Sequence, residues 1–201
     1  MARPTVFVVD DDEAVLDSMK ALLETTGFSV ETYSSGLAFL ESDAPRRDGC
    51  LLLDLHMPGL DGFEVQQQLK DDGFDLPIVV ITAEGDVRMA VRAMQLGAHD
   101  FVEKPVSQDT ILRSISRALL HHKEGSPRIR HDEAIFARLT SREREVMEQL
   151  VAGLSNKSIA IELGISPRTV EIHRARIMEK LQARNLAQLV RLAMTAGIIS
   201  P

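Results

Sequence analysis

The sequence lacks the features that would place it outside the cytoplasm. It holds a single cysteine, Cys50, among 201 residues, so an internal disulfide is excluded and a reducing compartment is expected. No stretch approaches the roughly 20 consecutive apolar residues of a membrane span. The first residues lead directly into an apolar strand pattern, without the features of a signal peptide. These absences predict a cytoplasmic protein with no membrane contact, and a hydrophobic content of 44% predicts a well-formed core.

Positive charge is scarce in the first part of the chain. Residues 1–120 hold 10 Lys and Arg against 21 Asp and Glu, a balance of −11, whereas residues 121–201 hold 13 against 9, a balance of +4. Such asymmetry suggests two modules with different partners. The acidic module suits a cation, and the basic module suits a polyanion.

The first 120 residues alternate between strand and helix patterns. Apolar runs predict five strands, at Thr5–Val9, Ser29–Tyr33, Cys50–Asp54, Ile78–Thr82 and Phe101–Glu103. Helical spacing follows each strand, at Ala14–Glu24, Gly36–Leu40, Phe63–Lys70, Val87–Leu96 and Ser107–Leu120. Five such units predict an α/β domain with a doubly wound, five-stranded parallel sheet, whose functional edge lies at the strand C-termini.

After residue 121 the pattern contains only helices. We predict an α/β domain over residues 1–121, a polar linker over 122–137 that Gly125 and Pro127 break, and a small all-α domain over 138–201. Thr140 and Glu143 form a capping box that opens the first helix of this domain. The helices at 156–163 and 167–181 are joined by a tight turn that contains Gly164, which is a helix-turn-helix arrangement.

Polar side chains gather at the predicted strand ends. Asp10 and Asp11 follow the first strand, Asp54 closes the third, Thr82 closes the fourth and Lys104 follows the fifth. Three carboxylates form a hard oxygen site that suits Mg²⁺ or Mn²⁺, and a central carboxylate beside a cation can act as a nucleophile. Lys104 would offset charge on phosphoryl oxygens, and Thr82 would donate its hydroxyl to one of them. This set predicts phosphoryl transfer to Asp54.

Asp10-Asp11, Asp54, Thr82 and Lys104-Pro105, in this order, resemble the receiver domain of two-component response regulators, a flavodoxin-like fold. The resemblance covers residues 1–120. It implies that Asp54 is the phosphoacceptor of a sensor histidine kinase. It also implies that the chain is no enzyme beyond catalysing its own phosphorylation and dephosphorylation.

The same resemblance assigns metal and switch residues. It implies that Asp11, Asp54 and the backbone carbonyl of His56 bind Mg²⁺ directly, and that Asp10 acts mainly through a bound water. Phe101 stands at the position of the switch aromatic, which turns inward as Thr82 moves toward the phosphoryl group. The side chain of His56 has no role in this scheme.

The helix at 167–181 is predicted to enter the major groove of DNA. At 100° per residue, Val170, Ile177 and Leu181 form one stripe that faces the core. Arginine suits guanine edges or phosphates, isoleucine suits a thymine methyl, and Lys and Thr suit phosphates. The candidate DNA-binding residues are Lys157, Arg168, Thr169, Glu171, Ile172, Ala175 and Arg176.

The stretches 139–146, 156–160 and 166–174 resemble LuxR-type DNA-binding domains. The whole chain is similar to response regulators of the NarL/FixJ class. This resemblance implies a transcription factor that binds promoter sites in double-stranded DNA, forms a homodimer on phosphorylation and contacts RNA polymerase. Many relatives carry Lys where this chain has Glu171 and Ala175, so their target bases do not carry over.

Other functions remain open at this point. The chain is alternatively a DNA-binding regulator that needs no phosphorylation, or a Mg²⁺-dependent phosphohydrolase of the haloacid dehalogenase type. Such hydrolases place a second Asp two residues after the nucleophile, where this chain has His56, which favours a long-lived aspartyl phosphate. Phosphorylation would act through dimerisation of the receiver or through release of masked DNA-binding helices.

Overall fold

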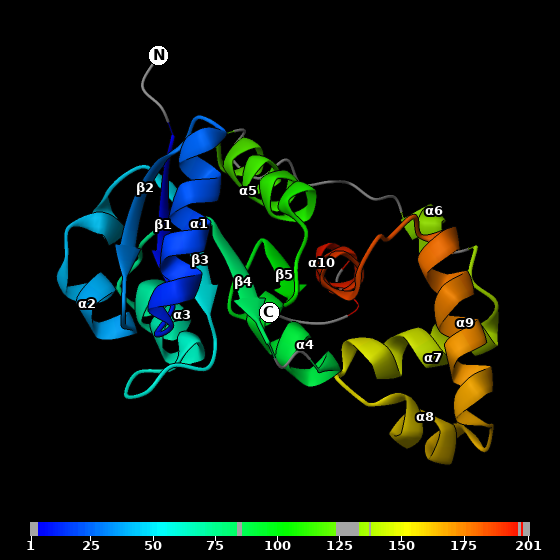
Figure 1. Ribbon diagram of the computed structural model, residues 1–201. Helices are drawn as coiled ribbons and strands as arrows, with labels where there is room; N and C mark the ends of the chain where they lie inside the picture. The colour runs from blue at the N-terminus through cyan, green and yellow to red at the C-terminus, as the bar shows by residue number, and fades with distance from the viewer. Residues whose placement is uncertain (1–3, 84–85, 124–132, 137, 197, 199–201) are drawn as a thin grey trace. The chain divides into compact units, whose positions relative to one another are not determined.

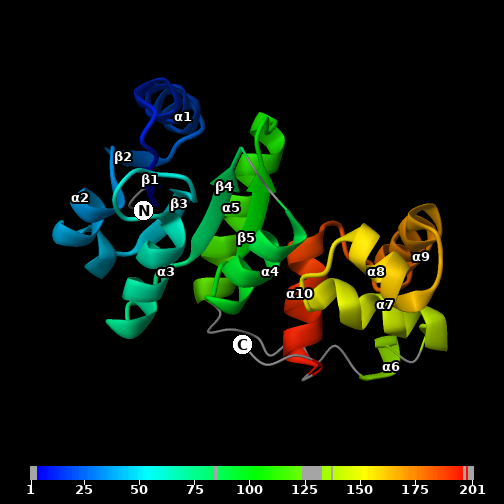
Figure 2. The same ribbon diagram turned by 90° about the horizontal axis from the view of Figure 1, so that it is seen from below.

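The computed structural model describes residues 4–83, 86–123, 133–136, 138–196 and 198. Packing divides the chain into two compact units, residues 1–84 with 96–127 and residues 85–95 with 128–201. The first unit contains a sheet with helices around it, and the described residues of the second form helices alone (Figures 1 and 2). The second unit includes α4 (Val87–Gln95), which connects β4 with β5 in the chain.

The sheet has five strands, all parallel, in the order β2-β1-β3-β4-β5. They are β1 (Thr5–Val9), β2 (Ser29–Tyr33), β3 (Gly49–Asp54), β4 (Ile78–Thr82) and β5 (Asp100–Glu103). The predicted parallel sheet is therefore confirmed. Three of the strands agree with the sequence prediction residue for residue, and β3 and β5 begin one residue earlier than predicted.

Helices cover both faces of the sheet. The first unit contains α1 (Glu13–Thr25), α2 (Gly36–Glu41), α3 (Gly62–Asp71) and α5 (Gln108–Lys123). Val6, Val8 and Leu52 share one core cluster with Leu16 of α1 and Ile115 of α5. The alternate side chains of the strands point to the other face, where the Phe7 ring lies 6.1 Å from the ring of Phe39 in α2. A short 3-10 helix at Ala44–Arg46 was not predicted.

The central strand β3 is buried along its whole length. Its residues from Cys50 to Leu53 expose at most 1% of their surface, which is typical of a parallel strand covered on both faces. Burial also raises the pKa of the Cys50 thiol, which fits an inert packing role. Because β3 is held on every side, the residue at its C-terminal end has a fixed position.

Besides α4, the second unit contains α6 (Glu133–Phe136), α7 (Ser141–Val151), α8 (Asn156–Leu163), α9 (Pro167–Lys180) and α10 (Leu186–Thr195). The bounds of α8 agree with the sequence prediction, and α9 ends one residue earlier than predicted. Thr140 and Glu143 form both hydrogen bonds of the predicted capping box, and Ser166 caps α9. Gly164 has the left-handed conformation, with φ 64°, that ends α8.

The segment predicted as a linker contains one unexpected element. The helix α6 has only four residues, too few for a periodic pattern to reveal it from the sequence. The break predicted at Gly125 and Pro127 lies outside the described residues. The domain boundaries at 121 and 138 stay predictions.

Candidate functional site

Asp10 and Asp54 lie at the ends of neighbouring strands. Asp10 follows β1 directly and Asp54 is the last residue of β3, and these strands pair through Val9 and Leu53. The two carboxylates are buried, with 4% and 6% of each residue exposed. In this strand order the chain reverses its direction of winding between β1 and β3, which is where open α/β folds bind their ligands.

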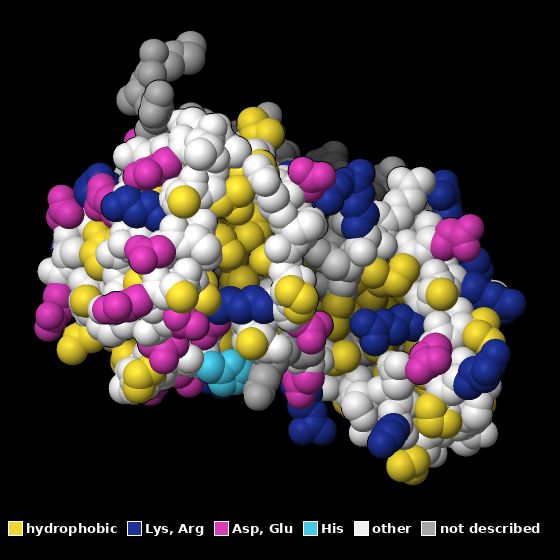
Figure 3. Space-filling model, in the orientation of Figure 1, with side chains coloured by type: hydrophobic (Ala, Val, Ile, Leu, Met, Phe, Trp, Pro, Cys, Tyr) yellow, Lys and Arg dark blue, Asp and Glu magenta, His cyan; other side chains and the backbone are white. Residues whose placement is uncertain are grey.

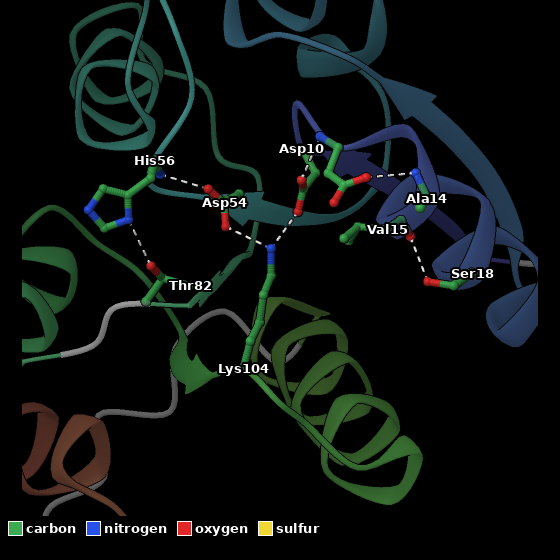
Figure 4. A network of polar contacts seen from close by, with 9 residues as sticks. Asp10, Ala14, Val15, Ser18, Asp54, His56, Thr82 and Lys104 are labelled. Carbon is green, nitrogen blue, oxygen red and sulfur yellow. Dashed lines mark hydrogen bonds and ion pairs between the residues drawn. The ribbon is translucent and has the colours of Figure 1, made fainter.

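Lys104, which follows β5, connects the two carboxylates. Its Nζ atom lies 2.6 Å from Asp10 Oδ2 and 2.9 Å from Asp54 Oδ1 (Figure 4). Its backbone N–H donates to the carbonyl oxygen of Thr82 over 2.7 Å, which holds the end of β5 against β4. The sequence predicted a lysine in this pocket, and the structure adds that its ammonium group is the direct partner of both carboxylates.

Burial and the ion pairs act against each other on the pKa values of this cluster. Burial raises the pKa of Asp54 above its usual value, and the hydrogen bond and charge of Lys104 oppose that rise only in part. Burial alone would lower the pKa of Lys104, but its hydrogen bonds to Asp10 and Asp54 outweigh this, and its pKa is raised. Lys104 therefore stays positively charged beside a carboxylate that is more basic than a solvated aspartate.

The loop after β3 orients the second oxygen of Asp54. Asp54 Oδ2 accepts a hydrogen bond from the backbone N–H of His56 over 2.7 Å. The helix α3 starts close beneath this loop, where Gly62 donates its N–H to the carbonyl oxygen of Leu55. A Cβ atom on Gly62 would lie 2.3 Å from the carbonyl oxygen of Asp54, so only glycine permits this approach.

Thr82 and Phe101, the predicted switch residues, occupy adjacent strands. Thr82 ends β4 and is completely buried, whereas Phe101 in β5 is partly buried. The Thr82 hydroxyl oxygen lies 3.1 Å from His56 Nδ1 (Figure 4). Sequence reasoning gave the His56 side chain no role and missed this contact. The available signal was that His56 follows the end of β3 by two residues and that Thr82 ends the neighbouring strand β4.

The predicted metal ligands are gathered only in part. Asp10 and Asp54 converge on one cation, the Lys104 ammonium, but Asp11 is exposed beside them. Within the described part of the chain, no three Asp, Glu, His or Cys side chains form a metal-binding group. Mg²⁺ is commonly held by one or two carboxylates together with water and phosphate oxygens. The convergent oxygens of Asp10 and Asp54 therefore fit such an ion.

The second unit presents the predicted helix-turn-helix. Val170, Ile177 and Leu181 are at most 1% exposed, as the predicted core stripe requires. Lys157 is exposed at the start of α8 and Thr169 is partly buried, and Figure 3 shows basic side chains on the surface of this unit. The other candidate residues form an exposed face of α9: Arg168, Glu171, Ile172, Ala175 and Arg176.

Side chains of α7 hold the two helices of this motif. Arg142 donates a hydrogen bond to the carbonyl oxygen of Leu163, the last residue of α8. Glu143, 3% exposed, accepts from Lys180 Nζ of α9 over 2.6 Å. This hydrogen bond is the main reason that the pKa of Glu143 is lowered to about 2. Neither contact was predicted, because the partners are far apart in the sequence.

Comparison with known proteins finds two described families along the chain. Residues 6–116 match the response regulator receiver domain, and residues 137–193 match the bacterial regulatory proteins of the luxR family. The transcriptional regulatory protein FixJ of Bradyrhizobium diazoefficiens is 44% identical over 198 residues, covering 97% of each chain. The crystal structure of full-length FixJ from B. japonicum covers 100% of each chain with 43% identity and a TM-score of 0.58. A low-resolution structure of the response regulator StyR is 46% identical, covers 96% of this chain and 98% of its own, and has a TM-score of 0.57.

The chain belongs to the two-component response regulators that join a receiver domain to a LuxR-type DNA-binding domain, and within them it is a FixJ-like transcriptional regulator. Response regulators of this family partner with sensor kinases and DNA, and their receivers generally bind Mg²⁺ at the acidic pocket. In the described residues, no helix combines the length and apolarity needed to cross a membrane.

Proposed function

We propose that Asp54 accepts a phosphoryl group from a sensor histidine kinase. A carboxylate oxygen of Asp54 forms the new bond to phosphorus while the bond from phosphorus to the donor's imidazole nitrogen breaks, in line with the attack. The observation that carries this proposal is the fixed, buried carboxylate at the end of β3, held by Lys104 Nζ on one oxygen and by the His56 N–H on the other.

The chain's own groups would stabilise the charge that develops in this transfer. Lys104 keeps its positive charge within hydrogen-bond distance of Asp54 and can move onto a phosphoryl oxygen. We assign Mg²⁺, or Mn²⁺, to Asp10, Asp11, Asp54 and the backbone carbonyl of His56, where it would neutralise charge on the phosphoryl oxygens. The convergence of Asp10 and Asp54 on a single cation supports this assignment.

Phosphorylation would shift a receiver that exchanges between two states. Thr82 would donate its hydroxyl to a phosphoryl oxygen, and Phe101 would follow it inward. This change alters the face formed by the last two βα units of the receiver, through which we propose that two chains dimerise. Release of masked DNA-binding helices is the alternative route to the same output.

The output is sequence-specific DNA binding by α9. Its exposed face would enter the major groove, with Arg168 and Arg176 directed to guanine edges or phosphates and Ile172 to a thymine methyl. In a dimer, two such helices would bind two half-sites together. The regulated step would be transcription by RNA polymerase in the cytoplasm. The chain would act as an enzyme only in its own phosphorylation and dephosphorylation.

Mass spectrometry with a small phosphodonor, acetyl phosphate, tests the phosphoacceptor. With Mg²⁺, the full chain should gain one phosphoryl group, and Asp54→Asn should gain none. Asp17→Asn is the matched control, since Asp17 is an exposed carboxylate on α1. An Asp54→Asn chain that is still labelled would exclude Asp54 as the nucleophile. A change from monomer to dimer on labelling would support dimerisation, and labelling without dimerisation would support release.

DNA binding is tested with duplexes selected by the wild-type chain from a random library. Arg168→Ala should weaken binding by about 5- to 150-fold, the equivalent of about 1–3 kcal/mol for a base contact, while labelling of Asp54 persists. Lys20→Ala removes the same charge from an exposed site on α1 and serves as the control. Equal losses in both variants would mean that Arg168 contributes only general charge.

A further inference from the structure

His56 connects the proposed phosphoacceptor with the proposed switch threonine. Its backbone N–H donates to Asp54 Oδ2 over 2.7 Å, and its imidazole Nδ1 lies 3.1 Å from the hydroxyl oxygen of Thr82. In Figure 4 the imidazole ring of His56 extends from the loop after β3 toward Thr82 at the end of β4. The unphosphorylated site therefore provides the Thr82 hydroxyl with an imidazole partner on the loop that follows Asp54.

A threonine hydroxyl has one proton to donate. The proposed function requires that proton for a phosphoryl oxygen on Asp54. We propose that His56 is a positioning residue that accepts this proton at Nδ1 in the unphosphorylated chain and so holds Thr82 away from Asp54. With Nδ1 as the acceptor, the ring hydrogen is on Nε2, which an exposed side chain can direct to water. Phosphorylation replaces this hydrogen bond with one from Thr82 to the phosphoryl group.

This inference rests on the proposed function and has a thermodynamic consequence. Each phosphorylated or phosphoryl-like state must break the hydrogen bond between Thr82 and His56. A hydrogen bond between neutral groups contributes a net factor of about 2 to 10 to an equilibrium. His56→Ala should therefore favour the phosphoryl-bound state by about that factor, and the backbone carbonyl of residue 56 remains available in the variant. The effect requires the Thr82 hydroxyl.

Equilibrium binding of beryllofluoride with Mg²⁺ to the full chain tests this consequence, because it is independent of phosphoryl hydrolysis. His56→Ala should tighten binding about 2- to 10-fold. His56→Asn should stay within about 2-fold of the wild type, since the Asn Oδ1 atom occupies the same place along the side chain as His Nδ1 and also accepts a hydrogen bond. In a Thr82→Val background, His56→Ala should change nothing.

Nitrogen-15 spectra of the imidazole in the metal-free chain give a second readout. Nδ1 should show the shift of an unprotonated nitrogen that accepts a hydrogen bond, and Thr82→Val should move that signal. A protonated Nδ1, or a gain in affinity that persists in the Thr82→Val background, would overturn the proposal. So would faster phosphoryl hydrolysis with unchanged beryllofluoride affinity, which would assign His56 to shielding the phosphoryl group from water. Absence of beryllofluoride binding in the wild type would instead count against the proposed function itself.

Discussion

Removal of the Lys104 ammonium should leave two buried carboxylates without their cation. Lys104→Met keeps a chain of similar length but removes the contacts of 2.6 and 2.9 Å to Asp10 and Asp54. Loss of one partner of a fully buried ion pair costs about 3–5 kcal/mol. Because 22% of the Lys104 side chain is exposed, water can replace part of its charge. We therefore expect a loss of about 2–3 kcal/mol in the free energy of unfolding of the metal-free receiver.

Mg²⁺ should restore more stability in this variant than in the wild type. A cation that binds only the folded state stabilises it more the more tightly it binds, and in the variant Mg²⁺ no longer competes with an ammonium group for Asp10 and Asp54. The assay is urea unfolding of each chain with EDTA and with saturating Mg²⁺. Lys70→Met, at an exposed site of α3, is the control and should change stability little.

The pH dependence has a definite sign. Burial already raises the pKa of Asp54, and without Lys104 this pKa should rise further. A carboxyl group with a raised folded-state pKa contributes stability below its unfolded pKa and loses that contribution as the pH rises through its folded pKa. The loss of unfolding free energy in Lys104→Met should therefore be largest near neutral pH and become smaller toward about pH 4. A loss of unfolding free energy that is independent of both Mg²⁺ and pH would refute the reasoning, because it would then come from packing alone.

Two further predictions concern single contacts. Glu143→Gln should destabilise the helical unit by about 1 kcal/mol. The lowering of the Glu143 pKa from 4.5 to about 2 sets an upper limit of roughly 3 kcal/mol. The expected loss is smaller because 34% of the Lys180 side chain is exposed, so that water screens the ion pair. That loss should be present above about pH 4.5 and disappear as the pH falls toward about 2, as urea midpoints at several pH values would show. The added methyl group of Gly62→Ala should displace the loop at Asp54 and lower the free energy of unfolding by about 1–3 kcal/mol. It should also slow the labelling of the chain by acetyl phosphate. Unchanged labelling would mean that α3 shifts and the loop does not.

Much of the fold follows from local sequence patterns. Strands such as β1 and β4 are short apolar runs with clear breaks at either end, so even their bounds are predictable. The caps at Thr140 and Ser166 are equally local signals. The 3-10 helix at Ala44–Arg46 and the four-residue α6 escaped prediction, because each is too short to show a hydrophobic period.

The contacts within the site depend on three-dimensional packing that a sequence pattern does not contain. Strand ends alone bring Asp10 and Asp54 together, since parallel strands share one carboxyl edge. Which side chain lies against which is decided by rotamers and by loop paths. Lys104 meets Asp10 from 94 residues away, and His56 meets Thr82 from 26 residues away. These long-range pairs determine the electrostatics of the site.

The charge balance of the pocket supports the proposal that Asp54, one of the chain's 30 acidic residues, accepts the phosphoryl group. Exposed carboxylates are already solvated and gain little from a cation, whereas Asp10 and Asp54 share a single ammonium and leave one negative charge uncompensated in a buried place. This uncompensated negative charge favours the binding of a divalent cation, and the cation would in turn offset the charge of the phosphoryl group. Phosphorylation of Asp54 would remove one carboxylate charge and place the phosphoryl charges beside Lys104, whose pKa is already raised. The burial that makes Asp54 costly to ionise is thus the same feature that would make its proposed phosphorylation responsive to the cations around it.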